Sequence, residues 1–73
     1  MPNHTLNDAE IADIRHQLQE LQVEHRDLDL VIAHLTDSPP PDDLLIRRLK
    51  KRKLALKDRI LQLEEMLVPD IPA

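Results

Sequence analysis

The chain has 73 residues and a formal net charge of −4, with 14 acidic side chains against 10 Lys and Arg. It contains no cysteine, glycine or aromatic residue, which excludes a disulfide framework, a thiolate metal site and a glycine-rich phosphate loop. A chain of this size buries little apolar surface, so self-association would help to stabilise it.

Residues 1–6 are expected to form a flexible N-terminus. The first residues lack the basic start and the apolar run of a signal peptide. No apolar stretch approaches the roughly 20 residues that a membrane span requires. We therefore expect a soluble, cytoplasmic protein that does not bind membranes.

A first helix is predicted over residues 7–36. Asn7 can serve as its N-cap, and Glu10 at the third helical position completes a capping box. The apolar residues recur in steps of three and four, as in a heptad pattern. They are Ile11, Ile14, Leu18, Leu21, Leu28, Ile32 and Leu35.

A proline corner is expected at residues 37–41, in the segment "TDSPPPDD". Each proline disfavours the helical conformation in the residue before it, so the first helix cannot continue through the corner. Pro41 is tolerable in the first turn of a second helix, whose amide-rich end Asp42 and Asp43 would complement.

The second helix is predicted over residues 41–68, with Pro69 ending it and residues 69–73 forming a tail. It repeats the pattern of steps of three and four. The positions are Ile46, Leu49, Lys53, Leu56, Ile60, Leu63 and Leu67.

Two apolar helices of similar length, joined by a short corner, predict an all-α, antiparallel, coiled-coil-like hairpin. Opposed residues should have numbers that sum to about 81 if the corner is the pivot. The expected pairs are Ile32 with Leu49, Leu28 with Lys53, His25 with Leu56, Leu21 with Ile60, and Glu24 with Lys57. Residues 1–38 carry eight acids and two bases, and residues 39–73 six acids and eight bases, so the halves attract each other or steer an outside partner.

Two polar residues, His25 and Lys53, interrupt the apolar seam. The favoured interpretation of His25 is a seam residue that packs on leucines while one ring nitrogen bonds Asp29. There are two alternatives. His25 could be a buried polar group that disfavours shifted alignments of the two helices, or it could be a pH switch. Lys53 can extend along the seam and raise its ammonium towards Asp29 or Asp27.

Neither a metal site nor a catalytic site is predicted, and no cofactor is expected. A metal ligand is the weakest hypothesis for His25, because His16, His25 and His34 are nine residues apart and no thiol is present. The single serine, Ser38, lies in the corner, and a two-helix hairpin encloses no pocket for acid–base chemistry. We therefore expect a protein that is not an enzyme.

A second apolar set lies off the seam, in pairs seven residues apart: Val23 with Leu30, and Leu54 with Leu61. Across the hairpin these residues are expected to flank one another as an outward apolar patch. Such patches mark association surfaces, although scattered surface aliphatics are also common. The prediction is a homodimer with a four-helix arrangement.

The segment "RRLKKRK" contains six bases in seven positions, which are Arg47, Arg48, Lys50, Lys51, Arg52 and Lys53. The favoured interpretation is a solvated basic turn that is partly neutralised by Glu24, Asp27 and Asp29. Docking to an acidic protein surface and contact with nucleic-acid phosphates are the alternatives. The absence of aromatic rings and the overall acidity oppose nucleic acid.

The segment "HRDLDLVIAHL" has an H-x-x-L-D-x-x-I pattern at His25, Leu28, Asp29 and Ile32, and residues 42–58 contain an L-x-I-x-x-L-K-K-x-K-L-x-L-K-D pattern. Both segments resemble the YdcH-like family of small bacterial proteins. The resemblance covers residues 18–67 and departs from the family at Arg59, where an acid is frequent. It implies a short bacterial helical hairpin, without an established activity, cofactor or substrate.

These observations favour a small non-enzymatic interaction or adaptor module. The alternative is a nucleic-acid- or ribosome-associated protein that uses residues 47–53.

Overall fold

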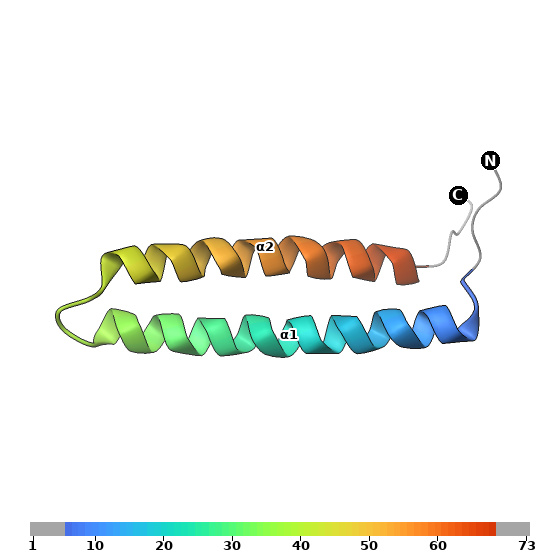
Figure 1. Ribbon diagram of the computed structural model, residues 1–73, viewed down its shortest axis with the longest axis horizontal. Helices are drawn as coiled ribbons and strands as arrows, with labels where there is room; N and C mark the ends of the chain where they lie inside the picture. Colours follow the sequence, from blue (N-terminus) through green and yellow to red (C-terminus); the bar gives the residue numbers. More distant parts are fainter. Residues whose placement is uncertain (1–5, 69–73) are drawn as a thin grey trace.

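The computed structural model describes residues 6–68, which form two helices that lie side by side and antiparallel (Figure 1). Helix α1 spans Asp8–Asp37 and helix α2 spans Asp43–Leu67. No strand is present between residues 6 and 68. The predicted all-α fold with two mutually packed helices is confirmed. The predicted flexible N-terminus, residues 1–6, lies outside the described residues except for residue 6. The predicted C-terminal tail, residues 69–73, lies outside them entirely.

The start of α1 is fixed by the predicted capping box. The Glu10 amide donates a hydrogen bond to Asn7 Oδ1 (2.7 Å), and the Asn7 amide donates to Glu10 Oε1 (3.1 Å). These two bonds satisfy amides that have no partner inside the helix. The helix therefore begins at Asp8, one residue after the start of the predicted range.

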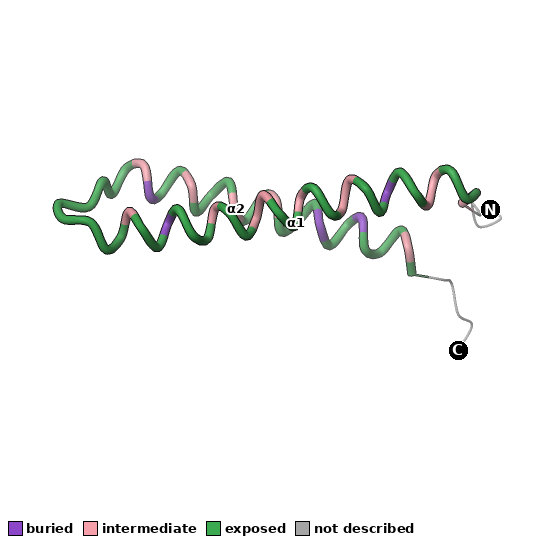
Figure 2. The backbone as a smooth tube through the Cα atoms, turned by 90° about the horizontal axis from the view of Figure 1, so that it is seen from below, coloured by how far each residue is buried: buried purple, intermediate pink, exposed green. Residues whose placement is uncertain are grey.

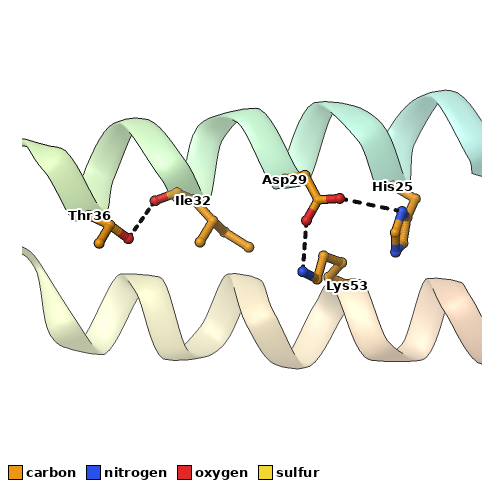
Figure 3. Close-up of polar contacts among 5 residues, drawn as sticks. All are labelled: His25, Asp29, Ile32, Thr36 and Lys53. Carbon is orange, nitrogen blue, oxygen red and sulfur yellow. Dashed lines mark hydrogen bonds and ion pairs between the residues drawn. The ribbon is translucent and has the colours of Figure 1, made fainter.

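The end of α1 is one residue later than predicted, at Asp37. Ser38 follows as the C-cap with an extended backbone, as expected for a residue that precedes proline. Its hydroxyl donates to the His34 carbonyl (2.9 Å), and the Thr36 hydroxyl donates to the Ile32 carbonyl (2.7 Å, Figure 3). Both hydroxyls thus satisfy carbonyls of the last turns.

The predicted start of α2 is wrong by two residues. Pro41 lies outside the helix, and Asp42 is the N-cap, with its carboxylate accepting a hydrogen bond from the Leu45 amide (3.1 Å). An aspartate at the N-cap bonds an unpaired amide directly, which a proline in the first turn cannot do. Val68, predicted to be the last helical residue, is instead the extended C-cap before Pro69.

The core is a single seam between the helices. Its buried members are Ile14, Ile32, Ile46, Ile60 and Leu63. The other apolar residues of the predicted seam are half-buried, and buried positions recur along the facing sides of both helices (Figure 2). Two helices cover each other on one side only, so most of each helix remains in contact with solvent.

Candidate functional site

The polar part of the seam is organised around Asp29. The Lys53 ammonium donates a hydrogen bond to Asp29 Oδ1 (2.7 Å), while the lysine stem lies in the seam with its side chain only 30% exposed (Figure 3). This is the predicted position of Lys53. The bond lowers the pKa of Asp29, because the ammonium stabilises the charged carboxylate.

His25 lies in the seam one turn before Asp29, and its side chain is 26% exposed. Its Nδ1 is 3.9 Å from Asp29 Oδ2 (Figure 3). This distance is too long for a hydrogen bond, so the predicted bond between His25 and Asp29 is not formed. Lys53 holds the other oxygen of this carboxylate, and His25 remains within ion-pair distance of Asp29 without a hydrogen bond.

Acidification is expected to weaken the hairpin through Asp29. Its pKa in the folded chain is lowered from the ordinary value of 3.8, so the unfolded chain binds the proton more tightly. The contribution is complete above the unfolded pKa and is lost as pH falls through the lower, folded pKa. The melting temperature should therefore fall as the pH drops from about 5 through the folded pKa of Asp29, and Asp29→Asn should reduce this fall.

Asp58→Asn is the matched control, since Asp58 makes no ion pair within residues 6–68. Its acid sensitivity should equal that of the parent. An unchanged acid sensitivity in Asp29→Asn would show that the Lys53 bond does not matter for stability.

A second ion pair joins the helices on the surface. Glu24 Oε1 lies 2.8 Å from an Arg52 guanidinium nitrogen, and Arg52 donates the hydrogen bond. The predicted partner, Lys57, makes no ion pair within the described range. Glu24 and Arg52 each directly precede a seam residue, so in antiparallel helices they lie on the same side of the seam, whereas Lys57 follows one and lies on the other side. Exposed pairs of this kind contribute about 0–1 kcal/mol.

Four bases of the segment 47–53 are exposed and make no ion pair with any residue between 6 and 68; these are Arg47, Arg48, Lys50 and Lys51. Only Arg52 and Lys53 are neutralised as predicted, by Glu24 and Asp29. Asp27, the third predicted partner, instead lines a shallow, open hollow on α1 with Glu20 and Val23. The unpaired bases form a cationic surface beside the corner.

The four apolar residues predicted off the seam are all exposed. Val23, Leu30, Leu54 and Leu61 are between 47% and 65% exposed. Val23 lies two residues from the seam positions Leu21 and His25, which is about half a turn in each direction. It and Leu30 therefore point away from α2, and the α2 pair points to the outer flank of its own helix.

One further exposed leucine was missed from the sequence. Leu44, in the first turn of α2, is 69% exposed, the highest value among the large apolar residues of the described chain. Its position two residues before the buried Ile46 was the available signal, because two residues place a side chain on the opposite face of a helix.

No group of three or more His, Cys, Asp or Glu residues that could hold a metal occurs between residues 6 and 68. Neither α1 nor α2 is long and apolar enough to cross a membrane.

Comparison with protein families decides where the chain belongs. The family model described as "Protein of unknown function (DUF465)" matches residues 18–64, well over half of the chain. The chain belongs to the DUF465 family. DUF465 is the YdcH-like family of small helical proteins, which confirms the resemblance seen in the sequence. No curated protein and no solved structure matches the chain.

The DUF465 match includes the polar seam, the unpaired bases and the exposed apolar pairs. It does not include the capping box of α1 or the last residues of α2. The family is of unknown function, so membership in it does not identify the function of this chain.

Proposed function

We propose that this hairpin is a non-enzymatic protein–protein interaction module that associates with a second copy of itself, as a homodimer with a four-helix arrangement. The observation that carries the proposal is the outward exposure of Val23, Leu30, Leu54 and Leu61 on a hairpin in which five residues between 6 and 68 are buried. An adaptor role and a cytoplasmic location belong to the same proposal.

The physical argument is the imbalance between buried and exposed apolar surface. The single seam leaves the outer sides of both helices uncovered (Figure 2). Covering apolar surface is worth about 25 cal/mol per Å², and paired leucines on a small hairpin supply such surface. A second hairpin would cover part of this surface and add the stability that a chain of this length lacks.

Sedimentation of the parent and of the double variant Leu54→Asp, Leu61→Asp tests the proposal. The parent should associate at high micromolar concentration, and the variant should be monomeric, because each aspartate would be desolvated in the interface. Gln62→Asp, an exposed position on the same helix, is the control and should associate like the parent. A monomeric parent at high micromolar concentration refutes the proposal.

The unpaired bases favour a second candidate function, association with nucleic acid or the ribosome. Four exposed cations beside the corner could contact phosphates, and each such contact would steepen the fall of affinity with salt. Binding to RNA and duplex DNA should be measured at low and moderate salt, with Arg47, Arg48, Lys50 and Lys51 changed to glutamine. If the parent does not bind, or the glutamine variant binds equally, this candidate fails.

A further inference from the structure

Each helix carries a second stripe of residues in steps of three and four, on its outer side. The outer α1 stripe starts at Asp13, ends at Asp37, and contains Glu20, Val23, Asp27 and Leu30. The outer α2 stripe consists of Leu44, Arg47, Lys51, Leu54, Asp58, Leu61 and Glu65, with its bases in the half next to the corner and its acids in the other half. Every residue of both stripes is exposed. This spacing is the one that packs helices along a seam, here without a facing helix.

The two outer stripes hold most of the exposed apolar surface. Five of the eight exposed large apolar side chains between residues 6 and 68 belong to them. The other three are Val31 and Met66, which directly precede seam residues, and Val68, the C-cap of α2. Apolar residues are thus concentrated where a further helix could pack.

The stripes carry opposite charge over part of their length. In the outer α1 stripe, Glu20 and Asp27 flank Val23 and line the same open hollow. In the outer α2 stripe, Arg47 and Lys51 lie between Leu44 and Leu54 and make no ion pair within the described chain. An acidic, partly apolar surface therefore exists on α1, and a basic, partly apolar surface exists on the half of α2 next to the corner.

A single hairpin cannot bring these surfaces together, because each lies on the side of its helix that faces away from the seam. The seam already joins α1 to α2 within one chain (Figure 1). A second copy supplies both missing partners, since it presents the same acidic surface on α1 and the same basic surface on α2. Nucleic acid would match the bases but not the leucines between them.

We propose that the outer α1 stripe of one copy packs on the outer α2 stripe of a second copy, with Glu20 and Asp27 facing Arg47 and Lys51. This inference rests on the proposed self-association and specifies its surfaces. The contact joins two different surfaces, so a dimer retains one free stripe of each kind. The four helices form one layer, and further copies add at its ends as the concentration rises.

Two charge-reversal variants test the pairing. The first, Glu20→Lys with Asp27→Lys, makes the α1 stripe basic; the second, Arg47→Glu with Lys51→Glu, makes the α2 stripe acidic. Each alone should associate more than about tenfold more weakly than the parent, because the side chains at the four facing positions then have the same sign. An equimolar mixture should associate about as strongly as the parent, because opposite stripes are again available. Sedimentation velocity measures all four samples, and circular dichroism verifies that each variant is helical.

The outcomes separate this inference from the proposed function. If the parent associates but the mixture stays monomeric, or if each variant alone associates like the parent, the pairing of stripes is wrong and self-association stands. If the parent is monomeric, both proposals fail. If the Arg47, Lys51 variant loses RNA binding yet associates like the parent, the basic stripe serves nucleic acid and the inference is overturned.

Discussion

Replacing Leu63 by alanine is expected to lower the free energy of unfolding by about 2–5 kcal/mol, the usual cost of truncating a buried leucine. Leu63 is 1% exposed, the lowest value in the described chain. A small domain has a total stability of only about 5–15 kcal/mol, so the variant should be largely unfolded at temperatures where the parent is folded. Urea titration followed by circular dichroism measures the loss.

Leu61→Ala is the matched control, because it makes the same substitution in the same helix at a residue that is 48% exposed. At concentrations where the chain is monomeric, it should change stability by no more than about 1 kcal/mol. Equal losses for Leu61→Ala and Leu63→Ala would contradict the seam that the fold assigns.

Replacing His25 by leucine is expected to stabilise the hairpin by about 1 kcal/mol or more, since apolar substitution of a polar group in a seam is often stabilising. The ring is mostly covered and makes no hydrogen bond to Asp29, so little is lost when it is removed. For a domain of this size the melting temperature should rise by about 4–8 °C per kcal/mol. Thermal unfolding in dilute solution measures the change.

His16→Leu is the control for this substitution. The His16 side chain is 70% exposed and lies 2.7 Å from Glu20 on the same helix face, so a leucine there should not raise the melting temperature of the monomer. A lower melting temperature for His25→Leu would show that the imidazole stabilises the fold. A pH switch predicts that the pH dependence of melting disappears with His25, whereas a packed seam residue predicts that it persists.

The features that could be predicted from the sequence are those encoded locally. The steps of three and four place Ile14, Ile32 and Leu63 on one side of each helix, and all three are buried. Asn7 and Glu10 fix the start of α1 through bonds within four residues. The contact of Lys53 with Asp29 was also predictable, because the pivot places them one residue apart across the seam.

The predictions that failed concern residues for which two different contacts compete. At the start of α2, capping by Asp42 prevailed over a proline in the first turn. Glu24 pairs with Arg52 because both lie on one side of the seam, which a count of opposed residue numbers does not distinguish. The Asp29 carboxylate bonds Lys53 at 2.7 Å and leaves His25 at 3.9 Å, a competition that spacing along one helix does not reveal.

The outer stripes show the same limit of periodicity. The spacing of seven residues identifies two apolar pairs, Val23 with Leu30 and Leu54 with Leu61, but Leu44 has no apolar partner seven residues away. The exposed Leu44 belongs to a stripe with Arg47 and Lys51, which the spacing of apolar residues alone does not indicate.

The most direct test of the hairpin is the distance between Gln19 on α1 and Gln62 on α2. Both residues are exposed, and because the chain has no cysteine, a cysteine at each site would carry a spin label without side reactions. Packed helices lie about 8–10 Å apart, so pulsed electron spin resonance on a dilute sample should give a label separation under about 30 Å. A separation near 65 Å, the length of one continuous helix between these residues at about 1.5 Å per residue, would contradict the antiparallel fold and the surfaces assigned to it.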